Sequence, residues 1–404
     1  MSNSPATDGS RPSSAVVLAA GEGIRLRPLT ANRPKPMLPA GTRPILEHVL
    51  NALIDAGVDD IHIVVGYQAN RVRSHFGPTY RDVPITYHTQ SNQLGSGHAL
   101  LQARDGPNGS FLLVNGDQII DHRIVEAVST AHTDAATLAV VEGPEAVDYG
   151  AVHLDGETVT ELIEQPASGE FRLFNAGVYA FSQRIFETLE ALSVERGELP
   201  LTAAIQQLID DDHAVGGVRT DHFWMDATHP WDLLSLSREL LARGWVDAPA
   251  VDSDVFVHES AHVHPDATLV GPVVVDSDVV IEAGAVVGPY AAIGASATIG
   301  SGSVLRDVVV DTDTVIGPNT TAVEFVAGQG CEMGAALTAS GGPADVVLDE
   351  QVYSDVDLGG VIADRVDVGG GATLEPGALI GPEATIGAGV VVRGHIDAGS
   401  EVVR

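Results

Sequence analysis

The most constraining feature of the chain is an apolar residue at every sixth position over most of its C-terminal part. The first run contains ten aliphatic residues: Val251, Val257, Val263, Leu269, Val275, Ile281, Val287, Ile293, Ile299 and Leu305. A second run contains seven: Val356, Ile362, Val368, Leu374, Ile380, Ile386 and Val392. A period of six fits neither an α-helix nor the two-residue alternation of a simple strand. It predicts a solenoid in which three six-residue sides make one coil, with the apolar residues stacked inside.

The register of this repeat breaks between Val310 and Gln351, so we expect an irregular loop or insertion at about residues 311–351. Hydrophobic residues make up 44% of the chain, whereas aromatic residues make up only 5%. Such a composition favours many small aliphatic contacts over a few aromatic ones. We therefore predict a parallel β-helix of hexapeptide repeats over residues 247–404.

The N-terminal part alternates short apolar runs with segments of helical spacing. Residues 15–20 form a continuous apolar run, which is typical of a strand buried on both faces of a parallel sheet. Helical spacing follows at residues 45–54, and then another apolar run at 61–65. Further strand-like runs occur at 85–89, 111–114 and 137–141. This order predicts an α/β, doubly wound, Rossmann-like domain over residues 14–246, preceded by a disordered leader over residues 1–13.

Charge and cysteine content exclude several classes of function. The chain has 21 basic and 55 acidic residues, a net charge of −34, which repels nucleic acids and anionic membranes. Cys331 is the only cysteine, so an internal disulfide is impossible. No apolar run reaches the roughly 20 residues that span a bilayer. We therefore expect a cytoplasmic protein with neither nucleic-acid nor membrane partners.

The same charge predicts a halophilic protein, because repulsion between acidic side chains weakens as the Debye length shrinks. We expect structure or assembly to be lost at low ionic strength and recovered in molar salt. Thermal melting followed by circular dichroism between about 0.1 M and 2 M salt measures this effect. A melting temperature that does not change over this range would instead indicate an ordinary acidic protein.

A loop containing glycines and cations follows the first apolar run. Gly21 and Gly23 let backbone N–H groups approach a phosphate, and the side chains of Arg25, Arg27 and Lys35 can neutralise one. Loops of this kind are more often ordinary strand-to-helix turns, so the glycines alone are weak support for phosphate binding.

Lys35 gives this loop its specificity. It is the only lysine in the chain, and it lies between Pro34 and Pro36. Two prolines stiffen the local backbone and can hold a compact ammonium group at a fixed point. The alternative is a solvated surface lysine. We predict a lysine that acts on phosphate.

The segment from residue 18 to 39, LAAGEGIRLRPLTANRPKPMLP, resembles the sugar-phosphate nucleotidyltransferase family. The family pattern is Gly-x-Gly-Thr-Arg-Leu-x-Pro-Leu-Thr followed by Pro-Lys-Pro-Met, and this chain departs from it at Ile24, where the family usually has threonine. The resemblance covers most of residues 14–240. It implies that Arg25 stabilises the triphosphate in the transition state and that Lys35 bridges the sugar phosphate and the α-phosphate. The nucleotide-binding residues that it implies here are Leu18, Ala19, Ala20 and Gly21.

The segment QSNQLGSGHA, residues 90–99, looks like the base-reading loop of the bifunctional N-acetylglucosamine-1-phosphate uridyltransferases. The resemblance implies that the Gln90 amide hydrogen-bonds the pyrimidine edge, that Gly95 lets backbone meet the base, and that Ser96 lies beside them. A glutamine amide offers a donor and an acceptor on one face. The alternative is a capped helix start. The residues of this loop resemble those of uridylyltransferases more than those of thymidylyltransferases. The expected nucleotide is therefore UTP, with dTTP as the other candidate.

Two carboxylates are candidate magnesium ligands. Asp117, in the sequence Val-Asn-Gly-Asp, follows an expected central strand, and Asp226 precedes a helix. Magnesium favours one or two carboxylates together with phosphate oxygens. Either aspartate alone could instead be a turn or cap residue. Asn115 and Gly116 belong to the same substrate-binding motif as Asp117.

The sugar-binding residues are carried over from the resemblance alone. They are Gly150, which supplies a backbone contact, and Glu164 and Asn175, which bind hydroxyl or acyl-amino groups. Together these features predict attack of a sugar 1-phosphate oxygen on the α-phosphorus of UTP, with release of pyrophosphate. The expected sugar is N-acetylglucosamine 1-phosphate or glucose 1-phosphate, and the expected cofactor is Mg²⁺.

Three alternatives stay open: a thymidylyltransferase acting on glucose 1-phosphate, a bifunctional enzyme that also acetylates glucosamine 1-phosphate, and a non-catalytic regulatory paralogue. Acetylating relatives carry an acceptor-side histidine and a Thr-x-Asn-Tyr-like segment, whereas this chain has residues 337–342, LTASGG. The resemblance further implies a left-handed β-helix and a homotrimer formed through it. Because every named catalytic residue precedes Asp247, the sequence predicts that a fragment of residues 1–247 keeps some nucleotidyl transfer.

Overall fold

The structure is a computed structural model that describes residues 11–132, 134–143, 149–164, 172–193 and 197–403. The expected leader therefore lies mostly outside the described residues. Contacts divide the chain into two compact units. The sheet unit comprises Met1–Gly21 and Leu46–Met225, and the β-helix unit comprises Glu22–Ile45 and Asp226–Arg404. The loop with Arg25 and Lys35 thus belongs to the same unit as the β-helix, although it lies within the N-terminal part of the sequence.

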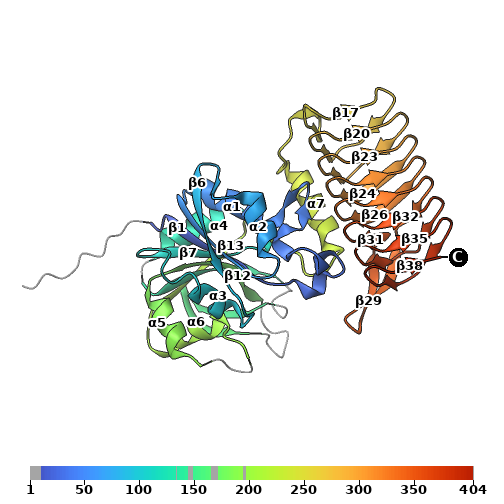
Figure 1. Cartoon of the computed structure of the whole chain (residues 1–404). Helices are drawn as coiled ribbons and strands as arrows, with labels where there is room; N and C mark the ends of the chain where they lie inside the picture. Colours follow the sequence, from blue (N-terminus) through green and yellow to red (C-terminus); the bar gives the residue numbers. More distant parts are fainter. Residues whose placement is uncertain (1–10, 133, 144–148, 165–171, 194–196, 404) are drawn as a thin grey trace, which may run out of the picture. The chain divides into compact units, whose positions relative to one another are not determined.

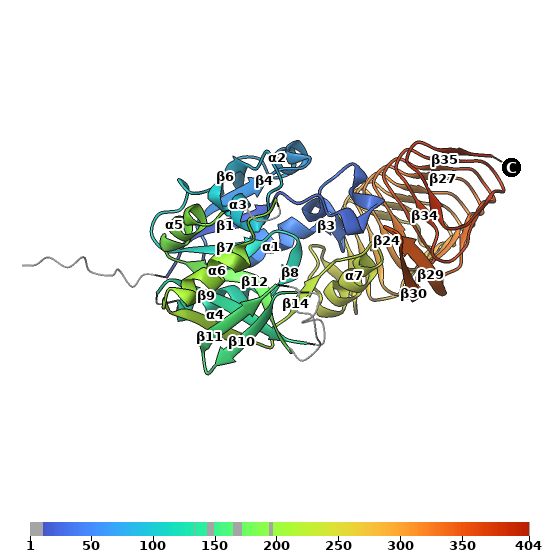
Figure 2. The ribbon, with the colours of Figure 1, turned by 90° about the horizontal axis from the view of Figure 1, so that it is seen from below.

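The sheet unit contains one ten-stranded mixed sheet, in the order β10-β11-β13-β9-β12-β7-β1-β4-β6-β5. The strands are β1 (Ser14–Ala19), β4 (Asp60–Val65), β5 (Thr79–Tyr80), β6 (Val83–Thr89), β7 (Phe111–Asn115), β9 (Ala136–Glu142), β10 (Ala151–Asp155), β11 (Thr158–Ile163), β12 (Leu173–Phe181) and β13 (Val215–Thr220). Strands β7, β1, β4 and β6 are parallel, as the apolar runs predict. Strand β12 is antiparallel to both β7 and β9, so the sheet is not parallel throughout. Figure 2 shows the antiparallel pair β10 and β11 at one end of it.

Helices cover this sheet. They are α1 (Ile45–Asp55), α2 (Ala69–Phe76), α3 (Ser96–Leu101), α4 (His122–Ala131), α5 (Arg184–Ala191) and α6 (Leu201–Asp210). Helices α3, α5 and α6 share a buried apolar cluster with the sheet, whereas α4 packs against β9, β12 and β13. Val16, Val17 and Val64 are completely buried. Consecutive residues of β1 can both be apolar because both faces of the parallel strands are covered.

The β-helix unit is a stack of short parallel strands (Figure 1). Its strands are β15 (Ala250–Asp252), β16 (Val255–Val257), β17 (His262–Val263), β18 (Thr268–Leu269), β19 (Val273–Val275), β20 (Val280–Ile281), β21 (Val286–Val287), β22 (Ala291–Ile293), β23 (Thr298–Ile299), β24 (Val304–Val310), β25 (Val315–Ile316), β26 (Thr321–Ala327), β27 (Glu332–Met333), β28 (Thr338–Ala339), β29 (Pro343–Leu348), β30 (Gln351–Asp357), β31 (Gly360–Ile362), β32 (Asp367–Val368), β33 (Thr373–Leu374), β34 (Leu379–Ile380), β35 (Thr385–Ile386), β36 (Val391–Val392), β37 (His395–Ile396) and β38 (Glu401–Val402). Val280 pairs with Thr298, so one coil advances the chain from 280 to 298, or 18 residues. The six-residue period therefore corresponds to one side of a three-sided coil.

The two ends of the repeat differ from the sequence pattern. Val251, the first residue of the pattern, is 62% exposed because β15 is antiparallel to β16 and lies outside the regular coils. Val356, the first residue of the second run, lies in the hairpin of β29 and β30. The other fifteen aliphatic residues of the two runs pack in, or against, one continuous core.

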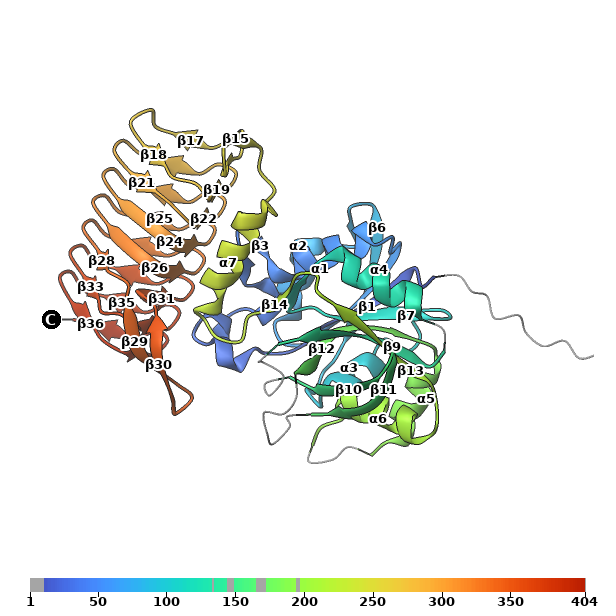
Figure 3. The ribbon, with the colours of Figure 1, turned by 180° about the vertical axis from the view of Figure 1, so that it is seen from behind.

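The register break has two separate causes. The inward residues Leu305 and Val310 are five positions apart rather than six, so the coil from Thr298 to Val315 advances 17 residues. The coils nevertheless continue regularly to Ala339. The insertion that the sequence predicts is the β29–β30 hairpin, which projects from the stack (Figure 3). The irregular part is thus shorter than the predicted residues 311–351, but the hairpin extends beyond them to Asp357.

One side of the coils is covered by α7 (Asp232–Arg243), which packs against β24 and β26 (Figures 1 and 3). Leu241 of α7 forms a buried cluster with Val274 and Ala292. The Glu22–Ile45 segment adds three short 3-10 helices, Ile24–Leu26, Leu29–Ala31 and Lys35–Met37, and the small strands β2 (Pro39–Ala40) and β3 (Arg43–Pro44). Within the described part of the chain, no helix has both the length and the hydropathy that crossing a membrane requires.

Candidate functional site

The carboxyl ends of β1 and β7 bring together two predicted nucleotide-binding segments. Gly116 N donates a hydrogen bond to Leu18 O at 2.8 Å, and a Cβ on Gly116 would lie 2.9 Å from the same oxygen. The close approach of the two segments therefore requires glycine at position 116. Gly21, by contrast, has no atom within 4 Å of the position that a Cβ would occupy. This open space beside Ala19 and Ala20 is compatible with a ligand that contacts the backbone.

The Gln90 side chain is buried, and its neighbours hold it in one orientation. Gln90 Nε2 donates to Gly95 O at 3.1 Å and lies 3.0 Å from His98 Nδ1. Gly95 has a φ of 91°, and a Cβ there would come within 2.8 Å of Leu199 O. No described residue donates a hydrogen bond to Gln90 Oε1, so this oxygen can accept one from a ligand. Ser96 Oγ accepts from Leu201 N at 3.0 Å, which ties the loop to the start of α6.

The three predicted sugar-binding residues lie together in the sheet unit. Asn175 N donates to Gly150 O at 2.9 Å. Thr202 Oγ1 donates to Glu164 Oε2 at 2.5 Å, and Thr202 Cγ2 lies 3.7 Å from where a Cβ of Gly150 would be. Thr202 was missed in the sequence because it belongs to no motif. Its contact with Glu164 is apparent only in the structure, where α6 lies against β11. Gln165, which follows Glu164 in the motif, lies outside the described residues.

The Asn175 side chain is fixed by its own neighbours. Its Nδ2 donates to the Tyr179 hydroxyl at 2.5 Å, and its Oδ1 accepts from Gly177 N at 3.1 Å. Burial raises the pKa of Tyr179, which keeps this phenol neutral. An amide whose donor and acceptor are both engaged has a defined orientation, because neither end can rotate without losing a hydrogen bond.

Aromatic rings pack close to the sugar-binding residues. Tyr149 stacks on Phe174 with ring centroids 5.2 Å apart and meets the edge of Trp224 at 5.1 Å. Trp224 Nε1 donates to Gln118 Oε1 at 3.1 Å and to Ala176 O at 2.8 Å. Trp224 therefore fixes the course of the chain just before Asp226. Trp224 was not singled out in the sequence, although it lies only two positions before Asp226.

In the β-helix unit, the lone lysine contacts a predicted metal ligand directly. Lys35 Nζ lies 2.5 Å from Asp226 Oδ1, and the two side chains are only 10% and 15% exposed. The structure thus brings together two predicted site residues that are far apart in the sequence. Arg25 lies on the 3-10 helix Ile24–Leu26 and is exposed, with no ion pair to a described residue. Its guanidinium is therefore available to an anionic ligand.

Gly23 has a different role from the one that the sequence indicated. Its φ is 68°, and a Cβ would lie only 2.7 Å from Lys35 Cβ. Thr30 Oγ1 donates to Gly23 O at 2.8 Å and holds this turn in place. Glycine at position 23 therefore makes room for the stem of Lys35 rather than for a phosphate.

The two candidate magnesium ligands lie in different units. Asp117 follows β7 in the sheet unit, directly after Gly116, and Asp226 ends β14 (Trp224–Asp226) at the start of the second part of the β-helix unit. Among the described residues, no group of three or more His, Cys, Asp or Glu side chains could hold a metal ion. The donor set nevertheless suits Mg²⁺, which takes few carboxylates and completes its shell with phosphate oxygens and water.

Comparisons with known proteins agree with these features. The family model described as "Nucleotidyl transferase" matches residues 14–243. The "Bifunctional protein GlmU" of Methanococcus vannielii is 34% identical over 422 residues, which cover 96% of this chain and 97% of the relative. The "UTP–glucose-1-phosphate uridylyltransferase AglF" of Haloferax volcanii is 37% identical over 224 residues, 54% of this chain and 92% of the relative.

Solved structures are similar in fold. A UDP-glucose pyrophosphorylase from Acinetobacter baumannii superposes with a TM-score of 0.51 at 22% identity, covering 57% of this chain and 94% of that chain. The inositol-1-phosphate CTP transferase of T. maritima gives a TM-score of 0.52 at 19% identity, over 60% of this chain and 99% of that chain. The chain therefore belongs to the nucleotidyl transferase family and is a sugar-1-phosphate nucleotidyltransferase.

Proposed function

We propose that this enzyme transfers a uridylyl group from UTP to N-acetylglucosamine 1-phosphate or glucose 1-phosphate, with Mg²⁺ as its cofactor. The observation that carries the choice of UTP is the orientation of the Gln90 amide. Its Nε2 is held by Gly95 O, which leaves Oε1 as an acceptor. Uracil and thymine present an N–H donor at N3, whereas cytosine presents an acceptor there. The amide therefore favours a uracil-type edge.

The sugar side supports an uncharged pyranose with several hydroxyl groups. Glu164 is exposed and supplies a carboxylate whose two oxygens accept hydrogen bonds, and Gly150 beside it is partly exposed. Hydroxyl or acyl-amino groups of the sugar would bind to these acceptors and to Asn175. The two candidate sugars differ at a single substituent. The shorter Haloferax volcanii relative is named for action on UTP and glucose 1-phosphate.

Catalysis in this proposal requires no protein nucleophile. The phosphate oxygen of the sugar attacks the α-phosphorus of UTP, and pyrophosphate leaves. Lys35 exchanges its contact with Asp226 for the phosphates and neutralises charge as it develops, and exposed Arg25 binds the leaving group. Asp117 and Asp226 would hold Mg²⁺, which supplies Lewis-acid neutralisation of the phosphates. The rest of the rate enhancement comes from holding the sugar 1-phosphate and UTP in a reactive orientation.

The proposal is tested by pyrophosphate release across a grid of UTP, dTTP and CTP with each sugar phosphate. We expect Gln90→Ala to raise the KM for UTP about fivefold and to reduce the preference for UTP over CTP, since one directed hydrogen bond is worth about 1 kcal/mol. Gln183→Ala is the matched control, because Gln183 Nε2 donates to the backbone oxygens of Pro107 and Gly109 rather than to this loop. A Gln90→Ala enzyme with unchanged nucleotide preference would contradict the assignment.

We do not extend the proposal to acetyl transfer. The segment that differs from acetylating relatives forms an ordinary coil side, in which Leu337 and Ala339 are fully buried in the core. Thr338 and Ser340 are its only exposed polar side chains before the hairpin. We infer instead that the β-helix serves homotrimer assembly and support of the catalytic segments.

A further inference from the structure

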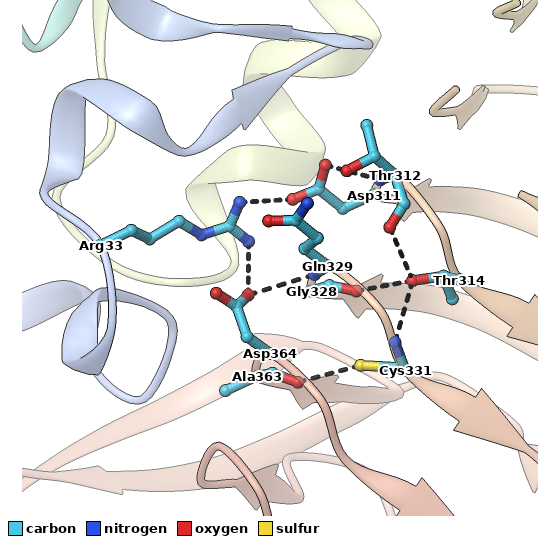
Figure 4. A network of polar contacts seen from close by, with 9 residues as sticks. All are labelled: Arg33, Asp311, Thr312, Thr314, Gly328, Gln329, Cys331, Ala363 and Asp364. Atoms are coloured by element: carbon cyan, nitrogen blue, oxygen red, sulfur yellow. Dashed lines mark hydrogen bonds and ion pairs between the residues drawn. The ribbon is translucent and has the colours of Figure 1, made fainter. Parts of the chain in front are cut away.

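Arg33 is a buried cation two residues before Lys35. Its guanidinium Nη1 lies 2.5 Å from Asp311 Oδ2, and its Nη2 lies 2.8 Å from Asp364 Oδ1 (Figure 4). Its side chain is only 6% exposed. Burial alone would lower the pKa of Arg33, but the two carboxylates outweigh it, so the net direction is upward. Arg33 is therefore a permanent charge held between two coils of the β-helix.

Both carboxylates are themselves fixed by the backbone of the coils. Asp311 follows β24, and its Oδ1 accepts from Thr312 N at 2.7 Å. Asp364 follows β31, and its Oδ1 accepts from Gln329 N at 3.1 Å (Figure 4). The guanidinium is a planar fork, so contact with two anchored carboxylates fixes its position and direction. The β-helix thereby sets where Arg33 lies.

Burial of this network is poorly explained by stability alone. Replacing a buried ion-pair network by apolar groups is often neutral or stabilising, because desolvation offsets the attraction between the charges. Arg33 Nε and Nη2 are also buried without a hydrogen-bond partner among the described residues, so Nη2 contacts Asp364 as an ion pair only. The network instead fixes the position of Arg33, and with it one point of the Glu22–Ile45 segment, on the coils.

A short, stiff piece of chain connects Arg33 to Lys35, so the position of one residue constrains the position of the other. Pro34 separates the two residues and has a fixed φ of −75°. Met37 N donates to Pro34 O at 2.9 Å, and Leu38 N donates to Lys35 O at 3.0 Å, which closes a 3-10 turn around Lys35. A displacement of Arg33 would therefore move the Lys35 ammonium.

The β-helix also contacts the segment that follows Asp226. Tyr353, on the inserted hairpin, meets the rings of His229 and Trp231 with centroid distances of 4.6 Å and 5.4 Å. His229 and Trp231 stack on each other at 4.7 Å. Lys35 and Asp226 thus each lie a few positions along the chain from a residue that contacts the coils or the inserted hairpin.

We propose that Arg33 is a positioning residue for nucleotidyl transfer: bound to Asp311 and Asp364, it makes the β-helix hold Lys35 in its catalytic position. This inference rests on the proposed action of Lys35 on phosphate. It assigns the β-helix a direct part in the N-terminal reaction. Acetyl transfer and assembly would be separate roles.

The test compares two full-length variants that each lose an ion-pair network. Arg33→Met with Asp311→Asn and Asp364→Asn removes all three charges together, so no buried carboxylate is left unpaired. Arg238→Met with Asp307→Asn is the control, because that pair joins α7, rather than the Lys35 segment, to the coils, with Arg238 Nε 2.8 Å from Asp307 Oδ1. We expect kcat to fall on the order of 10²-fold in the triple variant, since a misplacement of about 1 Å can cost that much. The KM for UTP and the control kcat should change little.

A second readout uses the single lysine. Reductive methylation followed by mass spectrometry of the Lys35 peptide reports its environment, and we expect faster modification in the triple variant because the contact with Asp226 loosens. If the triple variant fails to fold, Arg33→Lys keeps the charge but not the fork and should lower kcat several-fold.

Wild-type kcat and wild-type Lys35 reactivity in a folded triple variant would overturn the inference, as would wild-type kcat in Arg33→Lys. Activity in Lys35→Ala would overturn the proposed function itself. The two failures are therefore distinguishable.

Discussion

Lys35→Ala is expected to lower kcat on the order of 10²- to 10³-fold, the loss seen when one directed charge-stabilising group is removed from a transition state. The physical reason is the place of this ammonium in a nearly buried pair with Asp226, where water screens it little. The fold should survive, because Asp226 is 15% exposed and water can reach its carboxylate when the contact with Lys35 is removed. Pyrophosphate release at saturating substrates measures the effect, and circular dichroism verifies the fold.

Arg43→Ala is the matched control for that experiment. Arg43 is also a cation of the β-helix unit in an ion pair, with Asp247, but we assign it no part in the reaction. Asp117→Ala should resemble Lys35→Ala, since it would remove a magnesium ligand. If folded Lys35→Ala turned over at the rate of Arg43→Ala, the lysine would have no catalytic role.

A fragment of residues 1–247 is expected to lose nucleotidyl transfer on the order of 10²-fold or more, the reverse of what the sequence alone predicts. All named catalytic residues are present in it, but Arg33 loses Asp311 and Asp364. Helix α7 loses β24 and β26 at the same time. The Glu22–Ile45 segment would then no longer hold Lys35 in one place.

The measurement is pyrophosphate release by the purified fragment in high salt, with its secondary structure checked by circular dichroism. Light scattering of the full chain and the fragment reports the homotrimer that we propose, which the cut should abolish. Addition of the separate β-helix, residues 248–404, should not restore full turnover. A folded, soluble fragment with turnover within about tenfold of the full chain, or 1.4 kcal/mol, would show that the β-helix does not position Lys35.

Much of the candidate site could be predicted from short segments of sequence, because the position of each of these residues depends mainly on its neighbours in the chain. Leu18 and Gly116 lie at the ends of apolar runs, and parallel strands meet at their carboxyl ends whatever the rest of the fold does. Gln90 and Gly95 are five residues apart, so one loop determines their contact. Lys35 was evident because it is the only lysine and lies between two prolines.

Other features had no local signal. Gly23 and Thr202 acquire their roles from Lys35 and Glu164, which lie 12 and 38 positions away along the chain. The register break was visible, but its cause was not. A five-residue step that keeps Val310 inward looks like an interruption in the sequence, whereas in three dimensions the coil closes with one residue fewer.

The sequence by itself determined the β-helix and the parallel core of the sheet and singled out Lys35 as the candidate catalytic lysine, because periodicity, apolar runs and motifs each depend on residues close together in the chain. Only the tertiary structure decided what surrounds that lysine. Asp226 is 191 positions from Lys35, and Asp311 is 278 positions from Arg33. Ion pairs over such separations depend on how coils and segments pack, and no spacing in one sequence encodes them. For this reason the β-helix could be predicted as a module but not as a support for the reaction.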